Sequence, residues 1–189
     1  MSVGLVHGWA LALVLSAPAG PKGVEGATPL SVELATKVDA ADGTGPGIEA
    51  WLVSRSSDPL VVLIDASMWN HSALILRDAE GRKIQRYDTR SLRTQAATAT
   101  MPRPDHYITL RPGERRLLTR SHFSSQSGSW RISWGPYVHF ELPAGRYEAE
   151  VVWDNQRQDW FDPDTRSRGN SQDAWLGRVS SNRVRVQLD

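Results

Sequence analysis

Apolar and polar residues alternate in short runs along most of the chain, and each run ends in residues typical of turns. The clearest run extends from Tyr147 to Trp153, where apolar residues alternate with Glu148 and Glu150. Successive side chains of a strand point to opposite faces, so this pattern predicts a strand with one buried and one solvated face. No stretch keeps the period of an amphipathic helix long enough to predict one. The pattern therefore predicts an all-β protein.

The alternating runs and the turns between them divide the chain into expected elements. We expect strands at residues 30–38, 48–53, 60–64, 72–76, 82–87, 107–110, 115–119, 137–142, 147–153 and 179–188, with residues 130–134 forming either a short strand or a folded-back lip. The stretches 89–100 and 121–129 are expected to be loops. About seven to nine strands are typical of an immunoglobulin-like antiparallel β-sandwich, which we expect residues 29–189 to form as one domain.

A tight turn is encoded by Pro143 and Gly145, because proline presets φ and glycine accepts backbone conformations that other residues resist. Tyr147 follows two residues after the glycine, at the start of a strand. This arrangement resembles the tyrosine corner of immunoglobulin-like and fibronectin-III-like domains, in which the phenol hydroxyl bonds to the backbone just upstream. The resemblance implies that Tyr147 is buried and that its hydroxyl donates to the backbone between Leu142 and Gly145.

The second half of the chain has two such turns, in YITLRPGE and ELPAGRYEAEVVW, and a final strand that follows the motif SSN. From Tyr107 to Leu188 these motifs resemble secreted bacterial immunoglobulin-like domains of uncharacterised function. They are more loosely similar to the intracellular proteinase inhibitors of bacilli. An inhibitor needs a protruding loop, and no motif of this sequence marks one.

The first residues of the chain indicate its compartment. The segment Val3–Leu15 is almost entirely apolar and is followed by the motif APAG, which suits cleavage by a signal peptidase. We therefore expect a signal peptide at residues 1–19, a flexible leader at 20–28, and a periplasmic or extracellular mature chain without a membrane span. The alternative is a buried apolar N-terminal strand or helix, because the usual Lys or Arg near the start is missing.

Charge, cysteine content and motifs exclude several functional classes. The 22 basic and 21 acidic residues leave a net charge of +1, too small to attract nucleic acid or an anionic membrane. Cysteine is absent, which excludes disulfides, thiol nucleophiles and thiolate metal sites. The five histidines are scattered, and the sequence has no zinc-protease, nucleophile-elbow or phosphate-loop motif. We therefore expect neither enzymatic activity nor a cofactor.

Tryptophan is the most informative residue type in this chain. Trp51 and Trp153 fall inside expected strands, and we expect one of them to pack between the sheets. Trp69 and four others fall in or near expected loops, and these four are the candidate binding residues, namely Trp130, Trp134, Trp160 and Trp175. Their indole rings can stack on a sugar ring or on a protein partner. The alternative is that they close the open ends of the sandwich.

A long polar insertion, residues 154–175, separates the last two expected strands, and loops of this length are often functional. Asp159, Asp162 and Asp164 are weak candidates for calcium ligands, because calcium takes six to eight oxygen atoms. Neighbouring arginines can neutralise these carboxylates instead. A solvated loop without a metal is the interpretation that we favour.

These observations together predict a non-catalytic binding or structural module of the cell envelope. We expect residues 130–134 and the insertion 154–175 to meet at the end of the sandwich opposite the turn at Gly145, where they would form the recognition surface. The expected partner is a protein or polysaccharide of the envelope. A carbohydrate-binding module and a protease-inhibitor-like domain are the alternatives.

Overall fold

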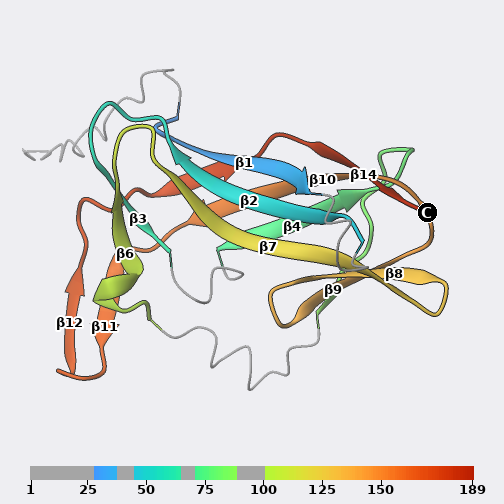
Figure 1. Cartoon of the computed structure of the whole chain (residues 1–189). Helices are drawn as coiled ribbons and strands as arrows, with labels where there is room; N and C mark the ends of the chain where they lie inside the picture. The colour runs from blue at the N-terminus through green and yellow to red at the C-terminus, as the bar shows by residue number, and fades with distance from the viewer. Residues whose placement is uncertain (1–27, 38–44, 65–70, 89–100) are drawn as a thin grey trace, which may run out of the picture.

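Antiparallel β-strands in two packed layers form the structure, a computed structural model that describes residues 28–37, 45–64, 71–88 and 101–189 (Figure 1). The predicted all-β sandwich is confirmed. The described residues form fourteen strands, more than the seven to nine expected, because several strands have only two to four residues. The predicted signal peptide, the leader as far as residue 27 and the predicted loop 89–100 lie outside the described residues.

The first sheet has six strands in the order β1-β2-β7-β8-β9-β5. Its strands are β1 (Leu30–Lys37), β2 (Gly47–Ser54), β5 (Tyr87–Asp88), β7 (Arg115–Gln126), β8 (Ser129–Trp134) and β9 (Val138–Leu142). β1 and β2 pair over their full length. Every second residue of β1 from Leu30 to Leu34 is buried, as the alternating pattern predicts.

Strand β7 passes through a stretch that the sequence predicts to be a loop. The prediction of a loop at residues 121–129 is wrong, because Ser121 and Phe123 point into the sandwich and are only 7% and 0% exposed. The first part of β7 pairs with β2 and the last part pairs with β8. Ser121 and Phe123 alternate inward as in a strand, but the small polar residues around them hide this pattern in the sequence.

The second sheet is centred on β10 (Gly145–Asn155), the strand that carries the clearest alternation. β4 (Ser72–Arg77) pairs with one edge of β10, while β14 (Val184–Leu188) and β13 (Gly177–Ser180) pair with the two halves of its other edge. The neighbour relations β1-β2-β7 and β4-β10-β14 are those of strands A-B-E and C-F-G in an immunoglobulin sandwich.

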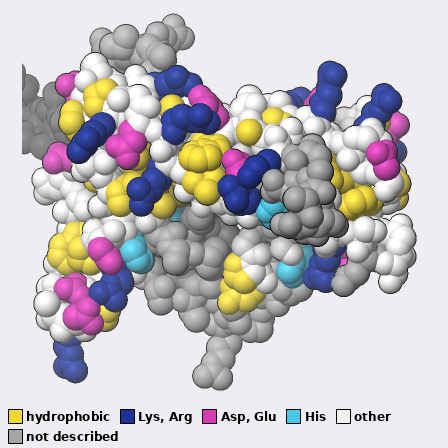
Figure 2. Space-filling model, viewed as in Figure 1, with side chains coloured by type: hydrophobic (Ala, Val, Ile, Leu, Met, Phe, Trp, Pro, Cys, Tyr) yellow, Lys and Arg dark blue, Asp and Glu magenta, His cyan; other side chains and the backbone are white. Residues whose placement is uncertain are grey.

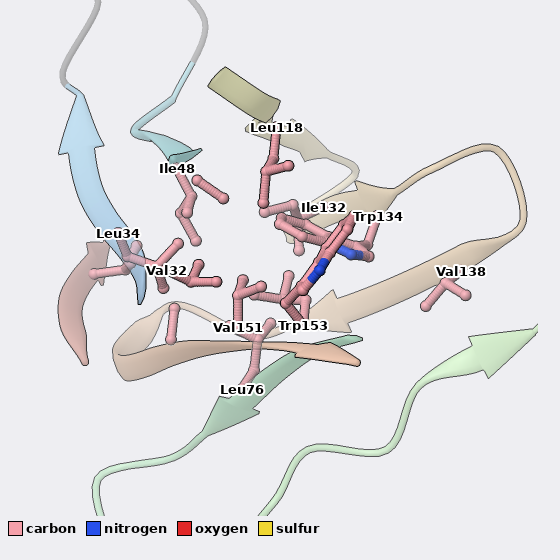
Figure 3. Packing of buried hydrophobic residues seen from close by; sticks show 14 of the residues in the cluster. Val32, Leu34, Ile48, Leu76, Leu118, Ile132, Trp134, Val138, Val151 and Trp153 are labelled. Carbon is pink, nitrogen blue, oxygen red and sulfur yellow. The ribbon is translucent and has the colours of Figure 1, made fainter. Parts of the chain in front are cut away.

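A continuous hydrophobic core joins the inner faces of the two sheets (Figure 3). The first sheet contributes residues such as Val32 and Ile48, and the second contributes Leu76, Val151 and Trp153. Trp153 is completely buried, so it is the tryptophan that packs between the sheets. Burial of one large apolar side chain contributes about 1.5–3 kcal/mol, so this cluster is the main source of stability in a chain without disulfides.

The turn at Pro143 connects the two sheets. β9 ends at Leu142 in the first sheet and β10 starts at Gly145 in the second, so the chain makes a corner here and not a hairpin. The Tyr147 hydroxyl donates to the Pro143 carbonyl oxygen at 2.9 Å, and the residue is 5% exposed. This contact is the tyrosine corner that the sequence predicts. Burial raises the pKa of Tyr147, with a smaller effect from Asp78, so the phenol is kept as a neutral donor.

Residues 82–87, which the sequence predicts to be one strand after the turn at Asp78, do not form one; of them only Tyr87 lies in a strand, β5. The turn itself forms, because the Asp78 carboxylate accepts hydrogen bonds from the backbone and the side chain of Arg82. Lys83 then makes a single bridge to Arg77, and the chain leaves β4 to reach β5, which pairs with β9. The end of this segment therefore pairs with the first sheet, and residues 82–87 do not form a hairpin with β4.

Two pairs of short strands lie outside the two sheets. β3 (Leu60–Leu63) pairs with β6 (Tyr107–Leu110), and β11 (Asp159–Asp162) pairs with β12 (Ser167–Asn170). Both pairs lie at the end of the sandwich away from the Pro143 corner, on the left in Figure 1. A short helical turn, Pro104–His106, precedes β6 beside them.

The Asn182 side chain connects the two sheets, because it extends from the turn between β13 and β14 to the edge of β1. Its Oδ1 accepts from the Leu34 backbone N–H at 2.8 Å, and its Nδ2 donates to the Leu34 carbonyl at 3.1 Å. Among the described strands β1 pairs with β2 only, and on its other edge the amide supplies the two hydrogen bonds that a neighbouring strand would make at Leu34. We expect Asn182→Ala to lower the free energy of unfolding by about 1–2 kcal/mol in urea melts, because two backbone groups lose their partners. Asn182→Asp, which keeps only the acceptor, should also destabilise, and a change below about 0.5 kcal/mol in both variants would contradict this role.

Candidate functional site

The insertion 154–175 is not an irregular loop, because its centre folds into the β11–β12 hairpin. The hairpin extends beyond the two sheets at the left end of the view in Figure 1. Four residues, 163–166, form its tip between Asp162 and Ser167. Figure 2 shows hydrophobic, acidic and basic side chains interspersed along the hairpin, with a basic side chain projecting at its tip.

The tip is ordered by its own side chains. The Asp162 carboxylate accepts hydrogen bonds from the Asp164 backbone N–H at 3.0 Å and from the Thr165 hydroxyl at 2.7 Å. Asp and Thr in this arrangement stabilise turns by replacing backbone hydrogen bonds. The Thr165 hydroxyl, followed by the backbone N–H of Asp164, holds the pKa of Asp162 below its usual value. Arg166 completes the reversal in the left-handed region, at φ 55°.

The outer edge of β11 is fixed to the segment that leads into β6. The Phe161 backbone N–H donates to the Pro102 carbonyl at 2.8 Å, and the Tyr107 hydroxyl donates to the Asp159 carbonyl at 2.9 Å. The Arg103 guanidinium binds the Asp164 carboxylate with a nitrogen–oxygen distance of 2.8 Å. Backbone, phenol and ion-pair contacts together fix the orientation of the hairpin relative to the sandwich.

The base of the hairpin is held by two amide side chains. Asn155 is completely buried, and its Nδ2 donates to the Trp175 carbonyl at 2.6 Å. Gln158 Nε2 donates to the carbonyls of Gln172 and Ala174, at 3.0 and 2.8 Å. The buried Asn155 amide is engaged at both ends, because its Oδ1 also accepts from the Arg157 backbone N–H at 3.1 Å, and such an amide restricts the backbone that it bridges. The hairpin is therefore a fixed projection and not a free loop.

Trp160 is the predicted binding residue that lies on this hairpin. It is half-buried and is not part of the hydrophobic core cluster. Gly169 is its partner across the hairpin, and a Cβ atom added at Gly169 would overlap the indole ring. Phe161, the next residue after Trp160, is also half-buried, and the Arg168 guanidinium lies 5.7 Å from its ring centre. Two aromatic rings thus stand outside the core on a fixed support.

Trp175 lies between the hairpin and β13. It is half-buried, packs against the core and rests on Gly177. Its backbone N–H donates to the Val61 carbonyl at 2.8 Å, which ties this connection to β3. The next residue, Leu176, is 47% exposed. Trp175 therefore covers the end of the sandwich, which is the structural role given above as the alternative to binding.

The prediction that Trp134 is a loop-borne binding residue is wrong. Trp134 is 2% exposed in the core, where Figure 3 shows it near Trp153, and its Nε1 donates to the Ser72 hydroxyl at 3.1 Å. Ile132, two residues earlier on β8, and Val138, the partner of Trp134 on β9, are buried as well. Every second side chain at the end of β8 faces the core, so Trp134 is buried like Ile132 two residues before it.

Trp130 lies at the other end of the molecule from Trp160. It pairs with Leu142 across β8 and β9, and its Nε1 donates to the Asp189 carbonyl at 3.2 Å, beside the Pro143 corner. The hairpin follows Asn155 at the opposite end of β10, about 30 Å away along the strand. The prediction that residues 130–134 and the insertion form one recognition surface is therefore wrong, since β9 and β10 belong to different sheets.

The three candidate calcium ligands do not converge. Asp162 is engaged by the tip, and Asp164 faces Arg103. Asp159 lies at the far end of β11, where its carbonyl oxygen accepts from Tyr107. Within the described residues, no group of three acidic or histidine side chains is arranged to hold a metal ion. The described geometry therefore provides no support for calcium binding by the insertion.

Of the two tryptophans that the sequence places in strands, Trp51 is the one that does not pack between the sheets. Trp51 lies on the outer face of β2, with the Arg115 guanidinium 5.0 Å from its ring centre, and Leu117 opposite it is 38% exposed. Alternation in the sequence places Trp51 on the face opposite Ile48, Ala50 and Leu52, and the burial of these three residues identifies theirs as the inner face.

A hollow of about 550 Å³ lies beside the tyrosine corner, between the Asp78 turn and strands β10 and β14. Its charged groups have partners: Asp78 binds Arg82 at 2.7 Å, and Glu148 faces Arg183 at 3.6 Å. Burial opposes the effect, but hydrogen bonds from the Arg82 backbone and side chain hold the pKa of Asp78 below its usual value. These groups stabilise the turn and the sheet, so we assign them a structural role.

His139 lies on β9, between β8 and β5 of the first sheet, and its Nδ1 and the Ser133 hydroxyl are 3.0 Å apart. The two residues face each other across β8 and β9, and Ser133 is exposed to solvent. Nucleophilic catalysis requires a substrate held in a concave, largely desolvated site, whereas no residue of the described ranges shields the Ser133 side chain from solvent. We therefore interpret the pair as a cross-strand contact of the kind that stabilises sheets.

Comparisons with known proteins do not narrow the function. A scan against protein-family models finds no match, and a search of the curated proteins finds none either. The described part of the chain contains no helix that is long and apolar enough to span a membrane. Functional inference for this chain therefore rests on the geometry of its own residues.

The residues that fix the hairpin were missed at the level of sequence. Arg103 and Tyr107 lie about 50–60 positions before their partners, and only the fold brings them together. A local signal for the hairpin itself was present, because the motif DPDT after two aromatic residues is rich in turn-forming side chains.

Proposed function

We propose that the protein is an exported, non-catalytic binding module of the cell envelope and that the β11–β12 hairpin is its recognition surface. The observation that carries this proposal is the presence of Trp160 and Phe161 outside the core, on a hairpin that three separate groups of contacts hold in place. Aromatic residues and arginine are enriched at protein interaction sites. A fixed support also lowers the conformational entropy that is lost on binding.

The expected partner is a protein or a polysaccharide of the envelope. A carbohydrate partner is favoured by one feature, the Trp160 ring held against Gly169, because an indole that is oriented before binding can stack on a sugar ring at little entropic cost. A protein partner is favoured by the arginines beside the aromatic rings, such as Arg168 over Phe161.

The effect of Trp160→Ala tests the proposed surface. We expect retention on purified cell-wall polysaccharide, or capture of a defined envelope protein, to fall at least about tenfold, equivalent to about 1.4 kcal/mol of binding free energy. Stability should change by less than about 1 kcal/mol, because Trp160 lies outside the core. Trp51→Ala, which removes a tryptophan from the outer face of β2, is the matched control and should retain binding. Equal binding by the parent protein and the Trp160→Ala variant would refute the proposal, as would equal loss in both variants.

A further inference from the structure

Strand β12 is the outer strand of the β11–β12 hairpin. Within the described part of the chain it pairs with β11 only, and its residues from Ser167 to Asn170 are exposed apart from Gly169. The other edge of the hairpin differs, because Phe161 and Asp159 on β11 bond to Pro102 and Tyr107. One side of this two-stranded unit is therefore bonded by residues 102 and 107, whereas no strand of the described ranges pairs with the other side.

The pairing register identifies which groups of β12 point outward. The Ser171 N–H donates to the Gln158 carbonyl, so backbone groups at alternate positions from Ser171 face β11. Arg168 and Asn170 are opposite Phe161 and Asp159, the β11 residues whose backbone groups point away from the hairpin. The N–H and C=O groups of Arg168 and Asn170 consequently point away from β11, in the spacing that an added antiparallel or parallel strand requires.

The charge along this edge is positive. Arg166 and Arg168 are exposed, and neither forms an ion pair with a carboxylate among the described residues. The two acidic residues of the tip are engaged elsewhere, Asp162 by Thr165 and Asp164 by Arg103. A strand beside β12 would therefore meet two guanidinium groups and no free carboxylate from the tip, which favours acidic side chains in that strand.

Gly169 provides an apolar contact at the centre of the same edge. Because it has no side chain, the Trp160 ring covers its Cα position from across the hairpin. A residue of an added strand beside Gly169 would therefore contact the indole directly, on the face of the hairpin opposite Arg168. Side chains of a strand alternate between faces, so the complementary sequence alternates acidic residues with apolar ones.

We propose that the protein binds an extended acidic segment of a partner polypeptide, which adds to β12 as a third strand. This inference rests on the proposed function and specifies its partner. The main-chain groups of Arg168 and Asn170 supply hydrogen bonds, the arginines select acidic residues, and Trp160 contacts the intervening apolar residue. Exposed edge strands of this kind are the sites at which proteins add strands from other chains.

The test uses the full chain and a synthetic capped peptide, Ser-Glu-Val-Glu-Val-Glu-Ser, with a counterpart in which lysine replaces glutamate. We expect NMR titration to show saturable shifts at Arg168 and Asn170 with the glutamate peptide, and slower hydrogen exchange of these two amides. The lysine peptide should bind at least about tenfold more weakly. Arg168→Glu should reverse this preference, because it inverts the charge beside the added strand.

A proline variant separates main-chain pairing from side-chain contact. Asn170→Pro removes one outward N–H, is compatible with an edge strand, and leaves the hydrogen bond from Ser171 to Gln158 intact. We expect it to reduce peptide affinity at least about tenfold, whereas the matched variant Asn170→Ala, which keeps the N–H, should bind within about twofold of the parent protein. Unchanged chemical shifts away from β12 would show that both variants are folded.

The possible outcomes distinguish this inference from the proposed function. Absence of saturable shifts, or equal affinity of Asn170→Pro and Asn170→Ala, would overturn strand addition. If Trp160→Ala still abolished retention on an envelope component in that case, the hairpin would be the surface but not a strand acceptor. Concentration-dependent dimerisation that Asn170→Pro abolishes, without peptide binding, would overturn the acidic partner in favour of a second copy of this chain.

Discussion

Replacement of Tyr147 by alanine should lower the free energy of unfolding by about 3–5 kcal/mol, as is usual for a large buried aromatic side chain. The ring is 5% exposed and packs in the core cluster, and its hydroxyl fixes the Pro143 corner between the two sheets. A typical domain is stable by about 5–15 kcal/mol, so this loss is a large part of the total. Urea melts followed by tryptophan fluorescence measure it.

The conservative variant Tyr147→Phe separates packing from the hydrogen bond. It keeps the ring and leaves the Pro143 carbonyl without its donor, so we expect a loss of about 1–2 kcal/mol. A neutral Tyr147→Phe would mean that the corner depends on packing alone. Because the pKa of Tyr147 is raised, the stability that comes from keeping it neutral is present below the ordinary pKa of about 10 and is lost as the pH rises beyond that value. The phenylalanine variant should lack this alkaline loss.

Trp134→Ala should also destabilise by about 3–5 kcal/mol, because the indole is buried between the sheets and its N–H is bonded to Ser72. Trp134→Phe fills part of the same space but removes the hydrogen bond from the indole N–H to Ser72, so a smaller loss of about 1–2 kcal/mol is expected. Equilibrium unfolding of both variants beside Trp160→Ala provides the comparison. The burial assignment fails if Trp134→Ala is as stable as Trp160→Ala.

The contrast between Trp134 and Trp160 matters for the interpretation of binding data. A loss of binding in Trp134→Ala would follow from unfolding alone and would say nothing about the recognition surface. Trp160 stands outside the core cluster, so a loss of binding in a folded Trp160→Ala variant would report on the hairpin itself. Stability and binding must therefore be measured on the same preparations.

Local patterns in the sequence were sufficient to predict strands and turns. The alternation from Tyr147 to Trp153 predicts a half-buried strand because side-chain direction in a strand depends only on position along the chain. The turn before β7, where Gly113 has φ 74°, and the Pro143 corner could be predicted for the same reason. Glycine and proline determine the backbone conformation at their own positions. The tyrosine corner bonds two residues that are only four positions apart, so it was visible as a short motif.

The sequence also contained signals that only the structure explained. The alternation of Trp51 with Ala50 and Leu52 defines two faces, but it does not say which face meets the other sheet. Trp153 occupies the core and Trp51 faces outward because Ala50 and Leu52 already fill the inner face of β2. In β7 the buried pair Ser121 and Phe123 was concealed by polar neighbours, and burial of Phe123 outweighed the weak strand propensity of the serines.

What the sequence by itself determined is the all-β class, the principal turns and the corner at Tyr147, because each depends on residues a few positions apart. Only the tertiary structure decided that β9 and β10 lie in different sheets, that Trp134 is buried, and that Trp130 and Trp160 lie at opposite ends. It also decided that Arg103 and Tyr107 fix the hairpin from more than fifty positions away. Strand pairing of this range follows from the packing of the whole core, which no local pattern contains.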